Sequence, residues 1–394
     1  MGTPVILSAA RTPVGRFLGG LASLSATDLG AIAYKEALAR STVAPGEVTE
    51  VILGNVVSAG LGQAPARQVA LKAGLPESIS AYAVNKVCGS GLQAVMLAAQ
   101  AIRAGDAQVV LAGGTESMSN APHYLRKQRT GSPYGHGLLE DSLLTDGLEC
   151  AFEKWHMGSA AEHIGRRFKI SREDMDKFAF ESHRRAVAAI EAGHFKKEIV
   201  AIEISQRKGP ALKVERDEGP RADTSLEKLA KLPPAFEKEG AITAGNASAL
   251  NDGAAALVVA DEAWAKAQGK RPLAKILAYA TSGVAPKEIF HAPALAVPAA
   301  LALANKKLSD VDLFELNEAF AAQALANMRY LELDPAKVNV HGGAVAIGHP
   351  IGGSGARCLT TLLYALETTG KKLGVVSLCL GGGNAVALVV ERFA

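Results

Sequence analysis

Two cysteines and one histidine stand in glycine-rich segments, where side chains can take part in chemistry. Cys88 opens the run CGSG ahead of a helix-like stretch, Cys379 opens CLGGG after a strand-like stretch, and His349 lies in the run GHP. Backbone N–H groups and the helix dipole lower the thiol pKa of a cysteine at a helix start, typically to about 3.5–7.5. A histidine can supply the base that such a thiol needs. The sequence therefore predicts a covalent, thiol-based enzyme.

Each of these residues also has a purely structural interpretation. A free cysteine is most often a small buried apolar side chain, and His349 is equally well explained as a cap for the following helix. Asn317, in the run NEAF, is on its own better explained as a helix N-cap than as the holder of a water or a carbonyl. Cys379 fits a resolving thiol, an acid/base or a filler, and the glycines after it offer N–H groups to a thioester oxygen.

Composition argues against several classes of function. The 394 residues include 42 basic and 39 acidic ones, a net charge of +3, without the basic stripe typical of nucleic-acid binders. No apolar run reaches the length of a membrane span, and the first eleven residues lack the basic segment of a secretory signal. We therefore expect a cytoplasmic protein. Cys88, Cys150, Cys358 and Cys379 lack zinc-type spacing, so free thiols and no metal site are expected.

Short apolar runs alternate with helical patterns, which predicts an α/β fold with mostly parallel strand pairing. The predicted strands are 5–10, 50–54, 109–112, 254–260, 312–316 and 374–378, and the predicted helices are 29–40, 90–104, 159–168, 172–191, 318–328 and 353–369. The run GSG occurs at 89–91 and again at 353–355, each time before a helix and then a strand with a glycine cluster. We interpret this recurrence as a duplicated unit.

The segment between the two units differs in composition, because it carries more charged residues and is interrupted by several prolines and glycines. We expect an inserted loop domain at 122–245, an N-terminal half at 1–121 and 246–271, and a C-terminal half at 272–394. The basic stretch at 126–129 fits an oligomer contact or a solvated surface loop equally well.

Beyond these patterns, the chain resembles the thiolase family along essentially its whole length. The signature blocks are NKVCGSG at 85–91, NEAF at 317–320, GHPIG at 348–352 and CLGGG at 379–383. Four further blocks match in order: RTPVG at 11–15, GGTESMS at 113–119, HMG at 156–158 and TAGNAS at 243–248. Any single block is a weak pattern, but eight in the right order are highly specific. The similarity is greatest to the acetyl-CoA acetyltransferase branch.

This resemblance implies a thiolase-like duplicated core, with mixed, mostly parallel sheets layered with helices, and acyl transfer through an acyl-cysteine. It assigns Cys88 as the nucleophile and Cys379 as the acid/base at the acetyl-CoA α-carbon. It implies that His349 activates Cys88 and, with a water held by Asn317, stabilises the enolate oxygen. The backbone N–H groups of Cys88 and Gly381 are implied to bind the thioester oxygen.

The resemblance also implies coenzyme A or acetyl-CoA as a substrate, with no tightly bound cofactor. The residues that it assigns to coenzyme A are His156, Met157, Arg221, Ser248, Ala319 and Phe320. Members of the family are dimers or tetramers, so a homo-oligomer is expected, with a homotetramer acting in lipid metabolism as the specific expectation.

The leading expectation is an acetyltransferase that forms or cleaves acetoacetyl-CoA. A degradative 3-ketoacyl-CoA thiolase of broader chain length is the nearest alternative. A thiol redox protein using Cys88 and Cys379, or a non-catalytic acyl-CoA binder, are alternatives of another class. Two departures from the family pattern stand near the site: Ile289-Phe290, where short-chain members often carry Met-Gly, and Gly353, where alanine is usual.

Overall fold

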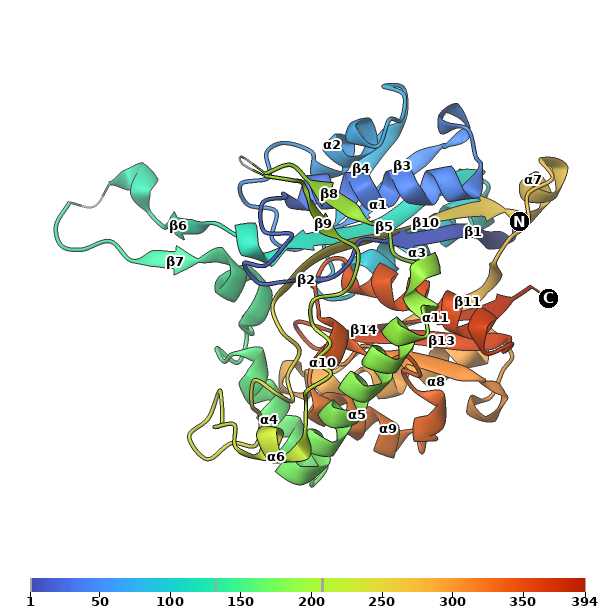
Figure 1. The fold of residues 1–394 in the computed structure, drawn as a ribbon. Helices are drawn as coiled ribbons and strands as arrows, with labels where there is room; N and C mark the ends of the chain where they lie inside the picture. The colour runs from blue at the N-terminus through green and yellow to red at the C-terminus, as the bar shows by residue number, and fades with distance from the viewer. Residues whose placement is uncertain (1, 132, 207–208, 394) are drawn as a thin grey trace.

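The computed structural model describes residues 2–131, 133–206 and 209–393. The outer ends of the predicted halves, at 1 and 394, and residues 132, 207 and 208 of the predicted insertion lie outside this description. The first part of the chain alternates strands and helices, and a later strand and helix return to it (Figure 1). These elements are β1 (Pro4–Arg11), β2 (Gly15–Arg16), α1 (Ala26–Ser41), β3 (Glu50–Gly54), α2 (Pro65–Lys72), β4 (Ser80–Val84), α3 (Ser90–Ala104), β5 (Val109–Ser117), β10 (Asn251–Asp261) and α7 (Glu262–Ala267).

The last part of the chain repeats this alternation. Its elements are β11 (Ala274–Gly283), α8 (Pro293–Leu303), β12 (Leu313–Leu316), α9 (Ala321–Tyr330), α10 (Ala344–Ile347), α11 (Ser354–Thr368), β13 (Leu373–Leu380) and β14 (Asn384–Arg392).

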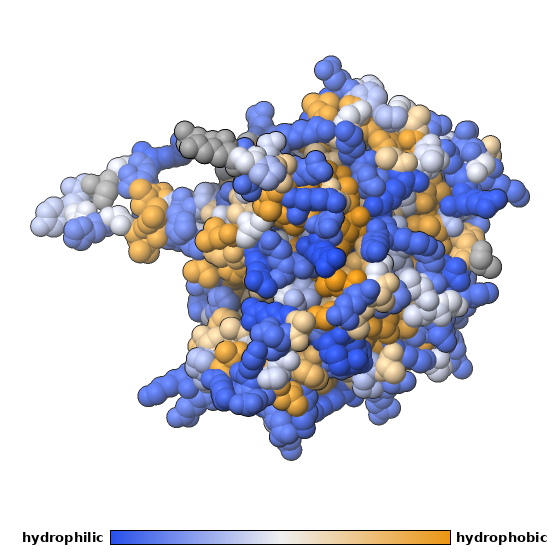
Figure 2. Space-filling model, in the orientation of Figure 1, coloured by the Kyte–Doolittle hydropathy of each residue, from blue (hydrophilic) through white to orange (hydrophobic). Residues whose placement is uncertain are grey.

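The intervening segment forms two small hairpins and the helices that lie over the two halves. Its elements are β6 (His123–Leu125), β7 (Leu139–Asp141), α4 (Met157–Arg167), α5 (Arg172–Glu191), β8 (Ile202–Ile204), β9 (Leu212–Val214) and α6 (Leu226–Ala230). The β6–β7 hairpin reaches far from the body (Figure 1). Hydrophilic side chains predominate on the face in Figure 2, but this hairpin also shows apolar ones, and Leu125, Tyr134, Leu138 and Leu139 are exposed along it.

One 10-stranded sheet joins the two halves, in the order β12-β13-β14-β11-β1-β10-β5-β3-β4, with β2 beside β10. Read outward from the β1–β11 junction, the series β1-β10-β5-β3 and β11-β14-β13-β12 have the same succession of two antiparallel pairs and one parallel pair. The duplicated unit predicted from the two GSG runs is therefore present, and β10 returns to the first half as expected.

The sheet is mixed, with more antiparallel pairing than the alternation of strands and helices predicts. Parallel pairs are confined to β3–β4, β3–β5 and β12–β13, in the outer parts of the sheet. The strands β13 and β14 are joined by only the three residues Gly381–Gly383, too few for the crossover that parallel strands need. Gly382 and Gly383 have φ angles of 83° and 89°, which glycine adopts readily, so the chain reverses there as a hairpin.

Helices α3 and α11 lie side by side between the two halves of the sheet. Leu92 of α3 and Leu359 of α11 belong to one buried apolar cluster with Val110 of β5 and Val376 of β13. Outside this layer, α1 and α2 cover the first half and α8 covers the second, each with an apolar cluster of its own. The order of the layers is therefore helix, sheet, helix pair, sheet and helix, which confirms the predicted α/β architecture.

The two GSG runs meet where α3 and α11 begin. A Cβ atom added at Gly91 would lie 2.9 Å from the backbone nitrogen of Ala356, and one added at Gly355 would overlap the backbone of Leu92. Side chains larger than hydrogen would push the helices apart at their first turns, so these two positions require glycine.

The predicted elements agree with the structure except at some ends. The helix expected at 318–328 begins instead at Ala321, because Phe320 is extended, with φ −146° and ψ 148°. None of the helices within the described residues combines the length and the apolar character needed to cross a membrane. Within the same residues, no three His, Cys, Asp or Glu side chains gather closely enough to hold a metal ion.

Candidate active site

The three side chains predicted to do chemistry line one cavity of about 450 Å³. Cys88 reaches it from the start of α3, Cys379 from the end of β13 and His349 from the turn before α11. The residues predicted to contact coenzyme A also line it: His156, Met157, Arg221, Ser248, Ala319 and Phe320. Residues from both halves and from the intervening segment therefore converge on one site.

A tight turn between β4 and α3 presents Cys88. The hydroxyl of Ser90 accepts the backbone N–H of Lys86 at 2.8 Å and donates to the carbonyl of Val87 at 2.7 Å. Val87 has a φ of 47°, a left-handed conformation that is strained for a β-branched residue. Residues held in such conformations cluster at functional sites, because the surrounding structure must keep them there.

The Cys88 thiol is neutral at rest. Burial raises the pKa of Cys88 to about 12, while the backbone N–H groups of Cys88 and Gly381 oppose this rise. The prediction that the helix start lowers this pKa is therefore wrong, since removing the sulfur from water outweighs the two donors. Cys88 needs a base to become a nucleophile. The backbone N–H groups of Cys88 and Gly381 lie close enough to its sulfur to act on its pKa.

His349 can serve as that base. Burial, followed by the charge of Arg357, lowers the pKa of His349 to about 3, so the imidazole is neutral near pH 7. The Oδ1 atom of Asn251 accepts the backbone N–H of His349 at 2.8 Å and helps to fix the turn. A neutral imidazole next to a neutral thiol accepts the thiol proton only as the reaction proceeds.

The hydrogen bonds around His349 identify which ring nitrogen is free to accept a proton. Nδ1 lies 2.6 Å from the hydroxyl of Ser354, and that hydroxyl donates to the carbonyl of Pro350 at 2.8 Å. Because its single proton is used in this way, the Ser354 oxygen accepts from Nδ1–H. The Nε2 atom of His349 therefore carries the lone pair.

Asn317 contacts His349 and is not a helix cap. Its Nδ2 atom lies 3.4 Å from His349 Nε2, and its Oδ1 atom lies 3.7 Å from the sulfur of Cys358. The cap position of α9 belongs to Phe320 instead. The structural interpretation of Asn317 is therefore wrong. Its amide nitrogen and the imidazole Nε2 atom are therefore neighbours.

Cys379 is a second buried thiol next to the first. It lies opposite Ala385 in the β13–β14 pair and is 1% exposed. Burial raises the pKa of Cys379 well above its usual value, and the nearby Cys88 raises it further. Both thiols line the same cavity. All four cysteines of the chain are free thiols, as expected.

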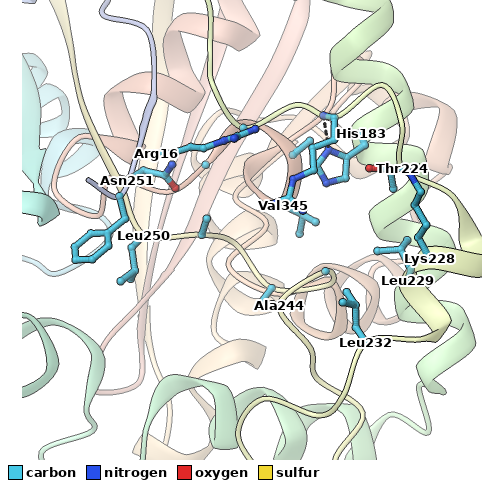
Figure 3. Close-up of a pocket in the computed structure, with 18 of the residues that line it drawn as sticks. Arg16, His183, Thr224, Lys228, Leu229, Leu232, Ala244, Leu250, Asn251 and Val345 are labelled. Carbon is cyan, nitrogen blue, oxygen red and sulfur yellow. Dashed lines mark hydrogen bonds between the residues drawn. The ribbon is translucent and has the colours of Figure 1, made fainter. Parts of the chain in front are cut away.

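A second cavity, of about 360 Å³, adjoins the first (Figure 3). The two share the lining residues Arg221, Ala244, Ala247, Ala249 and Leu250. Arg16 and Lys228 add positive charge to the second cavity, although the Lys228 amine also pairs with Asp223 at 2.7 Å. A long ligand with an anionic end can therefore extend from Cys88 toward basic side chains.

Comparison with known proteins agrees with this geometry. The thiolase N-terminal domain matches residues 4–263, and the thiolase C-terminal domain matches residues 270–392. The chain belongs to the thiolase family. It is an acyl-transferring enzyme, as the sequence blocks predicted.

Similar proteins cover the whole of this thiolase. It is 52% identical over 389 residues to the acetyl-CoA acetyltransferase of Escherichia coli (strain K12), and the matched region covers 98% of each chain. It is 50% identical over 393 residues to the probable acetyl-CoA acyltransferase of Staphylococcus epidermidis (strain ATCC 12228), which covers 100% of each. The crystal structure of the Bacillus anthracis acetyl-CoA acetyltransferase matches it with a TM-score of 0.98 at 44% identity, over 100% of this chain and 99% of that one.

Sequence reasoning missed a buried carboxylate in the thiolase site. Glu116, at the end of β5, accepts the backbone N–H groups of Val56 at 3.1 Å, Val57 at 3.2 Å and Gly352 at 2.9 Å. It lies in the block GGTESMS, but a lone glutamate after a strand usually faces solvent. Only the fold brings the three N–H groups to it.

Sequence reasoning also missed Phe236, which packs against the predicted residues His156 and Phe320 in the wall of the cavity. His156 caps α4 by accepting the N–H of Gly158 at 3.0 Å, and its ring stacks on Phe236 with the centroids 4.7 Å apart. Ser248 donates to the carbonyl of Ala319 at 2.9 Å and so ties one lining loop to the NEAF segment. No local pattern around Phe236 distinguishes it from an ordinary core residue.

The departures from the family pattern leave the turns intact. Gly353 has a helical φ of −85° as the cap of α11, so it makes no use of the extra conformational freedom of glycine. Phe290 is buried, and its ring lies edge-on to Phe320 at a centroid distance of 5.5 Å. Ile289 and Phe290 both line the cavity next to the thiols.

Proposed function

We propose that this thiolase interconverts two molecules of acetyl-CoA with acetoacetyl-CoA and free coenzyme A. The observation that carries the proposal is the single cavity lined by Cys88, Cys379 and His349, which continues into a second cavity with basic side chains. The relatives named acetyl-CoA acetyltransferase support it. Two thiols and an imidazole supply a nucleophile, an acid/base and an oxyanion donor, the three groups that a Claisen condensation needs.

In the first half-reaction, acetyl-CoA acetylates Cys88. The Cys88 proton moves to Nε2 of His349, and the sulfur attacks the thioester carbon. The carbonyl oxygen, as it becomes negative, accepts from the N–H groups of Cys88 and Gly381. The carbon–sulfur bond to coenzyme A then breaks, and the coenzyme A thiolate takes the Cys379 proton. An acetyl thioester on Cys88, a Cys379 thiolate and a protonated His349 remain.

In the second half-reaction, the acetyl group is joined to another acetyl-CoA. The Cys379 thiolate removes an α-proton, and protonated His349 with Asn317 stabilises the enolate oxygen. The enolate carbon attacks the acetyl carbon on Cys88, and the bond to that sulfur breaks. The Cys88 thiolate recovers its proton from His349, and Cys379 keeps the α-proton in place of the one lost to coenzyme A, so all three groups regain their starting protonation states. Splitting the exchange in this way predicts ping-pong kinetics.

The coenzyme A contacts are part of the same proposal. The adenosine and phosphate end would extend past Arg221 into the second cavity, and the pantetheine arm would run between His156 and Ser248. Two observations support this path: Arg221 lines both cavities, and His156 and Ser248 line the cavity that contains Cys88. Met157, Ala319 and Phe320 supply apolar surface there. Coenzyme A acts as a substrate and no tightly bound cofactor is invoked.

Intact-mass measurement after incubation with acetyl-CoA tests this function. The wild type should gain one acetyl group and release one equivalent of coenzyme A, and Cys88→Ser should fail to form a thioester. An unmodified wild type that binds acetyl-CoA would identify a non-catalytic binder instead. A protein that oxidises dithiols without coenzyme A would support the redox alternative.

We also propose that the protein is a cytoplasmic homo-oligomer that acts in lipid metabolism. Its proposed domains are those predicted above: an N-terminal half at 1–121 and 246–271, an inserted loop domain at 122–245 and a C-terminal half at 272–394. The exposed apolar side chains of the projecting β6–β7 hairpin support self-association. Light scattering with a variant that carries Leu138→Ser and Leu139→Ser tests it. A smaller assembly is expected for this variant.

A further inference from the structure

Two side chains of α11 hold the pair of residues proposed to stabilise the enolate. The Ser354 hydroxyl lies 2.6 Å from His349 Nδ1, and the Cys358 sulfur lies 3.7 Å from Asn317 Oδ1. Ser354 and Cys358 are four residues apart, so they lie on the same face of the helix. Each contacts the side of its partner that faces away from the His349–Asn317 contact. All four side chains are buried.

The hydrogen bond from Ser354 to the Pro350 carbonyl determines the directions of the other hydrogen bonds among these four side chains. Ser354 uses its proton on the Pro350 carbonyl, so it accepts from His349 Nδ1, and Nε2 is the unprotonated ring nitrogen. Asn317 Nδ2 then donates to that lone pair. The Asn317 oxygen is consequently turned toward Cys358, whose S–H donates to it.

We propose that Ser354 and Cys358 are positioning residues for the enolate-stabilising pair. Ser354 fixes the His349 tautomer with Nε2 unprotonated, and Cys358 fixes the Asn317 amide with Nδ2 toward His349. This inference rests on the proposed function, since it assigns these two residues to the enolate step.

The Cys358 thiol does more than fill space. The residue lies in the apolar cluster between α3 and α11, where an aliphatic side chain would pack as well. An aliphatic side chain would leave the buried Asn317 oxygen without a donor, and the amide could then rotate and place that oxygen against the Nε2 lone pair. The enolate would lose a donor, and complete loss of one such donor lowers kcat by about 10²–10³. Because the rotation is partial, we expect a smaller loss, of about tenfold.

Matched variants separate hydrogen bonding from volume. Cys358→Val keeps the approximate volume and removes the donor, whereas Cys358→Ser keeps a donor. Ser354→Ala removes the acceptor, whereas Ser354→Thr keeps the hydroxyl. Thr360→Val is the control, because Thr360 is buried on the same helix and its side chain, among the described residues, bonds only to the Ala356 carbonyl. Thermal unfolding of each variant shows whether it folds.

Three measurements test the role of Cys358. They are the rate of Cys88 acetylation by acetyl-CoA, the exchange of acetyl-CoA methyl protons in D₂O, and steady-state condensation. Cys358→Val should slow exchange and lower kcat about tenfold, with KM and the acetylation rate within twofold of wild type. Cys358→Ser and Thr360→Val should stay within about threefold. Wild-type exchange in Cys358→Val, or equal loss in Cys358→Ser, would overturn this role.

Nitrogen-15 NMR of labelled histidine tests Ser354 without any turnover. The wild type should show His349 protonated on Nδ1 alone, assigned by the signal missing in His349→Asn. Ser354→Ala should show a mixture of tautomers, and Ser354→Thr should restore the single form. One unchanged tautomer in Ser354→Ala would refute this part. Because this readout needs no acetylation of Cys88, it still decides the role of Ser354 if the proposed function fails.

Discussion

The carboxylate of Glu116 accepts the backbone N–H of Gly352 at 2.9 Å, three residues beyond His349. Glu116 belongs to β5 of the first half, and Gly352 belongs to the turn of the second half that carries the imidazole. The same carboxylate accepts from Val56 and Val57. One side chain therefore fixes the position of the catalytic turn against the opposite half.

Replacing Glu116 by glutamine should weaken both stability and catalysis. An amide places an NH₂ group where backbone N–H donors already point, so one or two buried donors lose their partner. We expect the free energy of unfolding to fall by about 2–3 kcal/mol and kcat to fall more than KM changes. Urea denaturation and steady-state kinetics measure these effects. Glu140→Gln, at the base of the projecting hairpin, is the control, and matching behaviour of the two variants would contradict the role of Glu116.

Cys379→Ala should separate the two half-reactions. Cys88 should still become acetylated, because the coenzyme A thiolate can take a proton from solvent. Condensation should fall by about 10²–10⁴, the usual contribution of a positioned acid/base. Rapid-quench mass spectrometry follows the acetyl-enzyme, and a coupled assay follows acetoacetyl-CoA. Equal loss of both half-reactions would show that Cys379 serves the nucleophile directly.

The acyl group accepted by this enzyme should be short. Phe290 and Phe320 pack edge-on beside the thiols and limit the room for an acyl chain. We expect kcat/KM for thiolysis to fall steeply from four-carbon to ten-carbon 3-ketoacyl-CoA. In Phe290→Ala the ratio of ten-carbon to four-carbon kcat/KM should rise, and a ratio is insensitive to partial unfolding. Comparable wild-type rates on both substrates would favour the degradative 3-ketoacyl-CoA thiolase.

Stability should depend on pH through buried His341. Burial, followed by the charge of His194, lowers the pKa of His341 to about 4, whereas a histidine in the unfolded chain has a pKa of about 6.5. Between these values the unfolded chain binds a proton that the folded chain does not. The contribution of His341 to stability is therefore present above pH 6.5 and is lost as pH falls toward 4, by up to about 1.4 kcal/mol per pH unit.

His341→Phe isolates this contribution, since phenylalanine can stack in the same place but cannot be protonated. The free energy of unfolding of the wild type, relative to this variant, should decrease as pH is lowered from 7 to 4.5. Urea titrations at several pH values measure the difference. A difference that stays constant across this range would show that His341 is as easily protonated in the folded chain. His136→Gln, on the exposed hairpin, serves as the control.

Much of the fold could be predicted because its signals are local. Helix α5 has its predicted bounds because Ser171 and Asp174 form a capping box at its start. Helix α3 ends as predicted because Gly105 adopts a φ of 88° after the last turn. Family resemblance supplied the remaining site residues, and the cavity contains nearly all of them. Asn317 and Gly381 lie outside its lining, although Asn317 contacts His349.

What could not be predicted depends on contacts between distant segments. The raised pKa of Cys88 results from the packing of the whole site around the sulfur, whereas the helix start that suggested a low value is a local feature. The hydrogen bonds of Glu116 and Cys358 join residues that are 236 and 41 positions apart. No periodicity or spacing in the sequence indicates such pairs.

The crossing of α3 and α11 at their first turns has a consequence for the field inside the enzyme. Each helix start carries a partial positive charge equivalent to roughly half an elementary charge. Cys88 stands two residues before the start of α3, and Ser354, the first residue of α11, contacts His349, so both helix starts lie near the same hollow. They arise from peptide dipoles and cannot titrate. Their contribution to the potential at a carbanion formed there would be the same in acidic and in alkaline surroundings.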